Sequence, residues 1–276
     1  MFKMHEHFFA INSFGEKISG ILHFPVSPGK DEVGFRRNPD KIKKGKFPVV
    51  VFVPGFTAPK NSWHAVNFFP AILEKGFAFV GFDFSGLGES EGKFEETTVS
   101  KQIADLKAVV EFLKKDSRFD SERIALIGSS LGGFDSLLFA SQNKIKALVL
   151  LAPLSKFVQE INEFVIQGTI AEWKKKGHAY AFPLDYGQKF KINYSFFEDG
   201  LSKDVYAIVP KISCPTLVIH GSGDAIVPLA QSEKLFNSLA CEKEFLVLDG
   251  ANHLFTNNGF FPRVLEASVN WIKKHL

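Results

Sequence analysis

The stretch that decides the fold is RIALIGSSLGG, residues 123–133. Its first five residues form a mostly apolar run typical of a buried strand, and residues 131–140 have the composition of a helix. Between them, Gly128-Ser129-Ser130-Leu131-Gly132 matches G-x-S-x-G, a pattern in which a serine occupies a sharp turn from strand to helix. We therefore predict that Ser130 exposes its hydroxyl at the C-terminal edge of a sheet as a candidate nucleophile, while Ser129 points back into the fold.

On both sides of this turn the sequence alternates between strand-like and helix-like segments. Residues 47–53 are a continuous apolar run rich in valine, as expected for a parallel strand buried on both faces. Residues 99–115 carry apolar residues at helical spacing. The alternation predicts a mostly parallel sheet with helices on both faces, preceded by an antiparallel hairpin. Strands are expected at residues 5–13, 17–24, 47–53, 77–82, 123–127, 145–151, 216–220 and 244–248, and helices at residues 62–75, 99–115, 131–140, 230–239 and 262–274.

The alternation stops over residues 154–209, where no clear sheet strand is visible. A loop of that length inside a compact domain requires a reason. We predict an inserted, partly helical cap at residues 154–209 that covers Ser130, with residues 1–153 and 210–276 forming the core. Its aromatic side chains would pack the cap or line an apolar substrate pocket. They include Phe157, Phe164, Trp173, Tyr180, Phe182, Tyr186, Tyr194, Phe196 and Phe197.

A serine hydroxyl is a poor nucleophile unless a base takes its proton. The chain has 8 histidines. Functional groups of such sheets gather on the loops that follow the C-terminal ends of the strands. His253, in Asp249-Gly250-Ala251-Asn252-His253, lies on such a loop after the last expected strand. It is therefore the candidate base, whereas His64 and His220 are weaker candidates.

The candidate acid lies in the sequence HGSGDAIVP, residues 220–228. This glycine-rich turn follows a strand and would let the carboxylate of Asp224 reach the histidine, fix its tautomer and stabilise the imidazolium. Asp249 is the nearest competitor, and we expect it to shape the turn before His253.

Two backbone N–H groups are candidates for stabilising an oxyanion. The N–H of Leu131 lies at the start of the expected helix, and the N–H of Phe56 lies in the loop PGFTA, residues 54–58. A third glycine-containing stretch, DFSGLGESEG at residues 83–92, follows a strand in the manner of a dinucleotide-binding loop. Glu91 stands where that motif needs its third glycine, so we interpret the stretch as a structural turn.

Composition excludes several classes of function. The net charge of +3 is too small to favour nucleic-acid binding, and we interpret the basic residues of loop 25–46 as solvated. The 2 cysteines, Cys214 and Cys241, do not form a disulfide framework. No segment has the length of a signal peptide's apolar region or of a membrane helix. We expect a cytoplasmic protein without a nucleic-acid or membrane partner; a homodimer is left open.

Taken together, five motifs resemble those of α/β-hydrolase carboxylesterases, and among these the bacterial feruloyl (cinnamoyl) esterases. They are the segments 54–57, 83–92, 128–133, 220–228 and 250–253. The order serine, aspartate, histidine also matches this superfamily. Two departures concern the surroundings of the site: Pro54 replaces a histidine before Gly55, and Ser129 and Leu131 replace the usual neighbours of the nucleophile.

The resemblance implies an eight-stranded, mostly parallel sheet with a cap inserted after Ala152. It also implies two-step hydrolysis of a small-molecule ester. Ser130 attacks, His253 moves the proton, Asp224 orients His253, and the N–H groups of Phe56 and Leu131 hold the oxyanion; no metal or cofactor is needed.

Two alternatives stay open at this point. One is a serine peptidase or aminopeptidase on the same scaffold, which would need carboxylates placed for a substrate amine; the cap offers Glu160, Glu163, Glu172 and Asp185. The other is a non-catalytic binding protein. Reaction with a fluorophosphonate probe would separate the second alternative from an enzyme.

Overall fold

The computed structural model describes residues 4–25, 46–157, 166–182 and 189–276. Most of the basic loop 25–46, together with Glu160, Glu163, Asp185 and Tyr186, lies outside the described residues.

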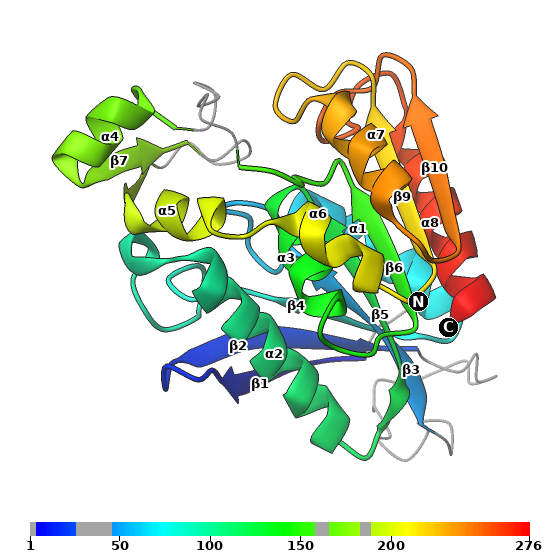
Figure 1. Ribbon diagram of the computed structural model, residues 1–276. Coiled ribbons are helices and arrows are strands. Elements are labelled where there is room, and N and C mark those ends of the chain that lie inside the picture. Colours follow the sequence, from blue (N-terminus) through cyan, green and yellow to red (C-terminus); the bar gives the residue numbers. More distant parts are fainter. Residues whose placement is uncertain (1–3, 26–45, 158–165, 183–188) are drawn as a thin grey trace.

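The centre of the described chain is an eight-stranded sheet with the order β1-β2-β4-β3-β5-β6-β9-β10 (Figure 1). β1 and β2 form an antiparallel hairpin, and β2 pairs antiparallel with β4. All the other pairs are parallel, so the predicted mostly parallel sheet is confirmed. The strands are β1 Met4–Ile11, β2 Lys17–Phe24, β3 Phe47–Val53, β4 Ala78–Phe82, β5 Phe119–Ser129, β6 Ala147–Leu151, β9 Thr216–Gly221 and β10 Lys243–Leu248.

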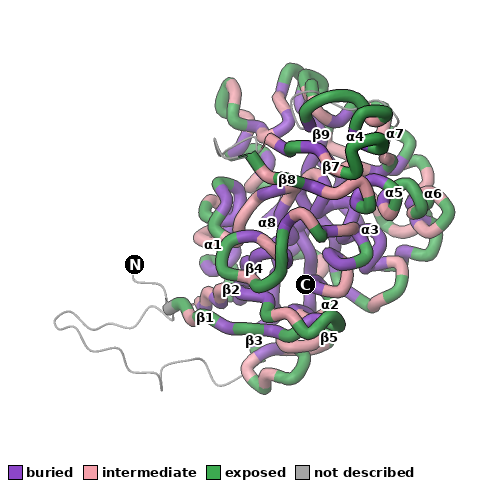
Figure 2. Tube along the Cα trace, turned by 90° about the vertical axis from the view of Figure 1, so that its left-hand side faces the viewer, coloured by how far each residue is buried: buried purple, intermediate pink, exposed green. Residues whose placement is uncertain are grey.

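Helices cover both faces of this sheet. The apolar residues of β3 alternate between two buried clusters: Val49 and Val51 belong to one cluster, and Val50 and Phe52 belong to the other. α1 and α8 contribute to the cluster of Val50, and α2, α3 and α7 to that of Val49. In Figure 2, buried segments lie in the interior of the molecule and exposed segments lie on its outside. The helices are α1 Trp63–Glu74, α2 Val99–Lys115, α3 Leu131–Ala140, α7 Leu229–Ser238 and α8 Phe261–His275.

β5 begins earlier than the sequence predicts. It starts at Phe119 rather than at Arg123, because Phe119 pairs with Phe47 ahead of an irregularity in the β3–β5 register. The polar residues between Phe119 and Ile124 interrupt the apolar pattern, so the extension has no signal in the sequence.

The segment 154–209 contains two short strands, β7 and β8, in addition to helices. They pair antiparallel in a separate two-stranded sheet, and each has four residues, too few to give a clear alternating pattern. α4 and β7 stand out from the core in Figure 1. The elements are α4 Ile170–Lys176, β7 His178–Ala181, β8 Phe190–Asn193, α5 Ser195–Leu201, α6 Val205–Ile208 and the 3₁₀ turn η3 Val209–Lys211.

Several contacts fix this segment to the core. Asp199 of α5 accepts hydrogen bonds from the N–H and hydroxyl of Ser100 at the start of α2, at 2.6 and 2.8 Å. Phe190 of β8 packs on Phe94 of the 3₁₀ turn η2 (Phe94–Glu96), with ring centroids 4.9 Å apart. Its division from the core as a separate cap stays a prediction. No helix in the described part of the chain has the length and apolar character of a membrane span.

Candidate active site

Ser130 occupies a strained turn between β5 and α3. Its φ of 54° and ψ of −117° lie in a region that residues with a side chain rarely adopt, at a cost of about 1–3 kcal/mol. Surrounding backbone bonds maintain the turn. The Ser130 N–H donates to the carbonyl of Leu151 at 2.9 Å, and its carbonyl accepts from the N–H of Gly133 at 2.9 Å and of Leu154 at 3.1 Å. The nucleophile candidate is thus fixed at the end of β5 and tied to the first residue of the segment 154–209.

The glycines of the motif are required by close backbone approach. A Cβ at Gly128 would lie 2.6 Å from the carbonyl oxygen of Gly132, and a Cβ at Gly132 would lie 2.2 Å from the carbonyl oxygen of Val53 in β3. Real Cβ atoms are not found at such distances from backbone atoms. Ser129 is buried, with 6% of its surface exposed.

The structure brings the three predicted catalytic side chains into one hydrogen-bonded chain. His253 Nε2 lies 3.0 Å from Ser130 Oγ, and His253 Nδ1 lies 2.7 Å from Asp224 Oδ2. The three residues follow β5, β9 and β10, whose C-terminal ends meet at one edge of the parallel sheet. These distances are within the range expected of a nucleophile, its base and the acid that orients the base.

The Asp224 carboxylate is held on both of its oxygens. Oδ1 accepts from the backbone N–H groups of Ile226 at 2.8 Å and Val227 at 2.9 Å. Oδ2 faces His253 and also His220, whose Nε2 is 3.0 Å away. Burial by itself would raise the pKa of Asp224, but hydrogen bonds from His220 and His253 hold that pKa well below its usual range. The acid therefore stays ionised beside the candidate base.

Sequence reasoning missed the contact between His220 and Asp224. The signal that could have revealed it is the short spacing in His220-Gly221-Ser222-Gly223-Asp224, which lets the last residue of a tight turn reach back to the end of its strand. Asp249, the other candidate for the acid, does not contact His253 in the structure. Asp249 accepts a hydrogen bond from the Ser222 hydroxyl at 2.7 Å and is exposed.

His64 is buried near His253, but its ring nitrogen faces a backbone carbonyl and not the hydroxyl of Ser130. Its Nε2 lies 3.1 Å from the carbonyl oxygen of Leu254. Burial lowers the pKa of His64 to about 4, and the neighbouring His253 adds to this shift. A ring with that pKa is neutral at pH 7, so it can pack beside the site without adding charge.

The two expected oxyanion donors lie next to Ser130. Leu131 is the first residue of α3, and the first N–H groups of a helix have no acceptor within the helix. A Cβ at Gly55 would lie 3.4 Å from Ser130 Cβ, so the loop that carries the Phe56 N–H passes directly beside the nucleophile. The role of Phe56 and Leu131 in holding an oxyanion stays a prediction.

The stretch at residues 83–92 has the contacts of a structural turn. Asp83 is fully buried and accepts from the backbone N–H groups of Lys60 at 2.6 Å and Glu89 at 3.0 Å. Lys60 Nζ also binds its carboxylate. A Cβ at Gly88 would lie 2.2 Å from the Asp83 carboxylate. This close contact explains why position 88 is a glycine, and no bound phosphate is needed to account for it.

A continuous group of aromatic rings links this edge of the sheet to the segment 154–209. The ring of Phe56 stacks on Phe196 of α5, with centroids 5.4 Å apart, and lies 5.7 Å from Phe94. Phe157 lies 5.6 Å from Phe196 and 5.2 Å from Phe134 of α3. Apolar side chains from the segment therefore contact the same loop that borders Ser130.

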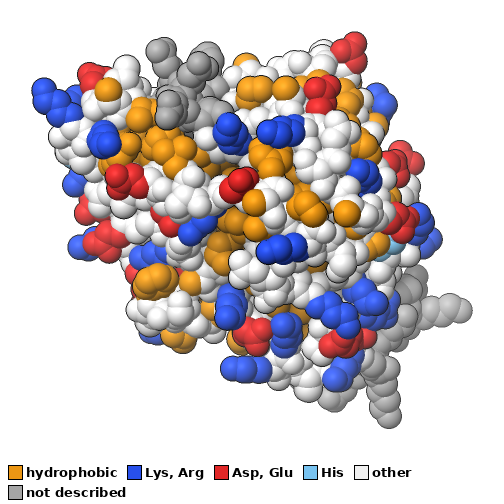
Figure 3. All heavy atoms as spheres, viewed as in Figure 1, with side chains coloured by type: hydrophobic (Ala, Val, Ile, Leu, Met, Phe, Trp, Pro, Cys, Tyr) orange, Lys and Arg blue, Asp and Glu red, His pale blue; other side chains and the backbone are white. Residues whose placement is uncertain are grey.

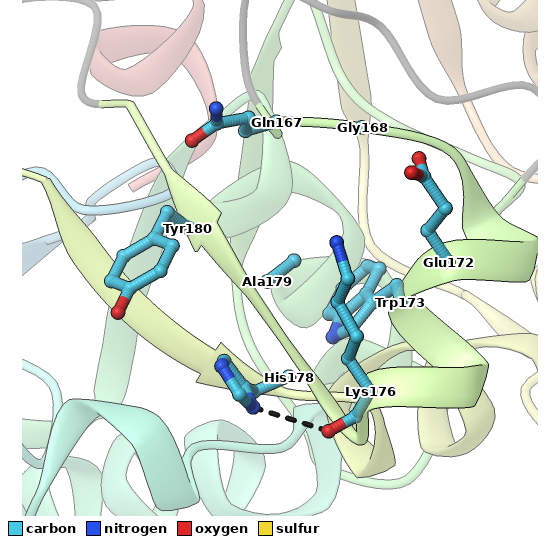
Figure 4. A pocket seen from close by; sticks show the side chains of 8 residues that line it. All are labelled: Gln167, Gly168, Glu172, Trp173, Lys176, His178, Ala179 and Tyr180. Carbon is cyan, nitrogen blue, oxygen red and sulfur yellow. Dashed lines mark hydrogen bonds between the residues drawn. The ribbon is translucent and has the colours of Figure 1, made fainter.

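A separate pocket of about 280 Å³ lies within the segment, between α4 and β7, and contains none of the three catalytic candidates (Figure 4). Glu172, Trp173 and Lys176 come from α4, and His178 and Tyr180 come from β7. The Glu172 carboxylate is already engaged, because Oε2 accepts from the N–H and hydroxyl of Thr169 and so caps α4.

Comparisons with known proteins agree with this architecture. The family described as "alpha/beta hydrolase fold" matches residues 48–183. Palmitoyl-protein thioesterase ABHD10, mitochondrial, is 31% identical over 212 residues in Bos taurus, covering 72% of this chain and 66% of that protein. In Pongo abelii it is 30% identical over 215 residues, covering 74% and 68%. The matched part spans about two thirds of the length of these relatives.

Solved structures share the fold over nearly the whole chain. A protein from Agrobacterium vitis S4 superposes with a TM-score of 0.77 at 20% identity, covering 99% of this chain and 100% of the other. Est1E from Butyrivibrio proteoclasticus, solved with ferulic acid bound, superposes with a TM-score of 0.70 at 24% identity, covering 97% and 96%. From its fold, the geometry of its site and these relatives, the chain belongs to the α/β-hydrolase family.

Proposed function

We propose that the protein is a serine hydrolase that cleaves carboxylic esters and thioesters through an acyl-enzyme. The observation that carries the proposal is the chain from Ser130 through His253 to Asp224, with distances of 3.0 and 2.7 Å, at a turn where Ser130 has a positive φ. Strain at a single residue persists only where the surrounding structure maintains it, and such residues cluster at active sites.

The proposed reaction uses only side chains and backbone of this chain. His253 Nε2 takes the proton of Ser130 as its Oγ attacks the acyl carbon, and Asp224 stabilises the resulting imidazolium. The N–H groups of Phe56 and Leu131 donate to the oxyanion. The C–O or C–S bond to the leaving group breaks, and the leaving alcohol or thiol takes its proton from His253. Water then attacks the acyl-enzyme by the same route and releases the acid.

We propose an apolar acyl group as the part of the substrate that is recognised. The support is the aromatic group formed by Phe56, Phe94, Phe157 and Phe196, because it contacts the loop beside Ser130. Two relatives point to acyl groups of this class: the mitochondrial proteins are named for a palmitoyl thioester, and Est1E was solved with ferulic acid. Hydroxycinnamoyl esters therefore remain within the proposal, beside thioesters of fatty acids.

The segment 154–209 is proposed to act as a cap that excludes water from the acyl-enzyme site. Leu154 is hydrogen bonded to the backbone of Ser130, and Phe196 of α5 stacks on Phe56. In the space-filling view, apolar side chains reach the surface on the face where α5 and α6 cross the core (Figure 3). Exclusion of water would strengthen the oxyanion hydrogen bonds.

A peptidase on the same scaffold is less well supported. Glu172, one of the carboxylates considered for binding a substrate amine, caps α4 through Thr169. The remaining three candidates lie outside the described residues. A cytoplasmic location, a small-molecule substrate and the absence of a nucleic-acid or membrane partner stay predictions from the sequence.

One substrate panel tests the function. It contains p-nitrophenyl esters of increasing chain length, methyl ferulate, a palmitoyl thioester and an aminoacyl anilide. We expect turnover of the esters and the thioester, loss of turnover in Ser130→Ala, and little cleavage of the anilide. Preferential anilide cleavage would refute esterase function, and absence of any turnover or fluorophosphonate labelling would support a binding protein.

A further inference from the structure

Two histidines converge on one oxygen of Asp224. Its Oδ2 is 2.7 Å from His253 Nδ1 and 3.0 Å from His220 Nε2. His253 comes from the loop after β10, whereas His220 is the fifth residue of β9, four positions before Asp224. His220 is completely buried and His253 is 6% exposed. Only one of the two rings reaches Ser130, so the second ring needs a separate explanation.

The contacts of His220 determine which of its nitrogens carries the proton. Its Nε2 faces two acceptors, Asp224 Oδ2 and the carbonyl oxygen of Val227, each at 3.0 Å. A proton on Nε2 is required to satisfy them. Its Nδ1 lies 2.6 Å from Ser232 Oγ and accepts the hydroxyl proton. With its proton on Nε2, the ring donates a hydrogen bond that Asp224 and Val227 share and accepts one from Ser232, so both ring nitrogens have partners.

The helix behind His220 is itself fixed. Ser232 is buried on α7, and its neighbour Gln231 accepts hydrogen bonds on Oε1 from the N–H of Ser155 at 2.9 Å and of Lys156 at 3.1 Å. α7 thus contacts both the start of the segment 154–209 and the ring of His220. A donor supported in this way holds its direction, which is the requirement for a group that positions a catalytic carboxylate.

We propose that His220 is a positioning residue: its Nε2–H holds Asp224 Oδ2 against His253 Nδ1 and takes up part of the negative charge on that oxygen. This inference rests on the proposed function. Without His220, the bond from His253 itself would be the remaining side-chain bond that fixes Oδ2. The full carboxylate charge would then act on His253, which favours its protonated form, and a protonated His253 cannot accept the Ser130 proton.

The experiment compares three replacements of His220 in the full-length protein. His220→Gln places an amide N–H near the position of Nε2, His220→Asn places it near Nδ1, and His220→Leu removes the donor. His5→Leu, on an exposed position of β1, is the control for loss of a histidine. The measurements are kcat and KM for a p-nitrophenyl ester and the rate of fluorophosphonate labelling at Ser130, each from pH 5 to 9, together with the thermal midpoint.

We expect His220→Leu and His220→Asn to lower kcat by about 10- to 100-fold, as for loss of one hydrogen bond to a charged group, with KM little changed. The acid limb of both pH profiles should move to higher pH, because more of the carboxylate charge then acts on His253. His220→Gln should recover most of the rate and the original limb, and His5→Leu should match the wild type. If His220→Leu does not fold, the Asn and Gln variants decide.

Two results would overturn the inference. One is labelling and turnover at the wild-type rate in His220→Asn or His220→Leu, with an unmoved acid limb. The other is an equal loss in the Gln and Asn variants that follows the thermal midpoint alone, which is the behaviour of a purely structural residue. Failure of the proposed function has a different signature, because the wild-type protein would then not be labelled at Ser130.

Discussion

Replacement of Asp224 by asparagine should stop catalysis while the fold is retained. The new amide has one oxygen and one NH₂ group in place of two oxygens. On one side it meets the backbone N–H groups of Ile226 and Val227, and on the other it meets the rings of His220 and His253. Backbone amides can only donate, whereas an imidazole can change its tautomer. The amide oxygen should therefore remain with the backbone, and the NH₂ group should face the histidines.

This orientation places the wrong tautomer at His253. Its Nδ1 would accept from the new NH₂ group, so its proton would move to Nε2, which lies 3.0 Å from Ser130 Oγ. A protonated Nε2 cannot take the serine proton. Loss of the tautomer in another serine hydrolase triad lowers kcat about 10⁴-fold, and we expect a similar factor here.

The assay is the turnover of a p-nitrophenyl ester, with circular dichroism to verify the fold. Asp249→Asn is the matched control, because this exposed carboxylate binds Ser222 rather than His253. We expect the control to retain most of its activity. More than a tenth of the wild-type kcat in Asp224→Asn, or an equal loss in Asp249→Asn, would refute the assignment of the acid.

Three further outcomes are expected. Ser130→Ala and His253→Ala should each lower kcat by about 10⁴ or more, while Ser129→Ala keeps most of it; a phosphonate adduct found by mass spectrometry on another residue would contradict this. Gly132→Ala should lower both kcat and the thermal midpoint, because its Cβ would lie 2.2 Å from a β3 carbonyl oxygen, and an unchanged midpoint would show that the turn can relax. Burial raises the pKa of Asp105 to about 6. The protonated form of Asp105 therefore adds roughly 3 kcal/mol to the free energy of unfolding below about pH 4, and this contribution is lost as pH rises to about 6. Urea unfolding of Asp105→Asn, measured across this range, should show a free energy of unfolding without that pH dependence.

Local patterns in the chain were sufficient for most of the fold. Continuous apolar runs predicted β3 and β6, because a strand covered by helices on both faces must be apolar on both faces. The helix at Val99–Lys115 has the predicted bounds, since its apolar stripe and its Thr98 cap are both encoded within a few residues. The pair β7 and β8 was not predicted, because four-residue strands leave too little pattern.

The sequence by itself determined the elbow at Ser130 and the order of the three catalytic candidates. Glycine is the residue that tolerates the close approach at positions 128 and 132, so the sequence motif alone predicts the turn. Tertiary structure decided which atoms meet. The contacts of Phe56 with Phe196 and of Ser100 with Asp199 have no pattern in the sequence that specifies them. Such contacts depend on how strands and helices far apart in the chain pack together, and side-chain distances of a few ångströms are set only by that packing.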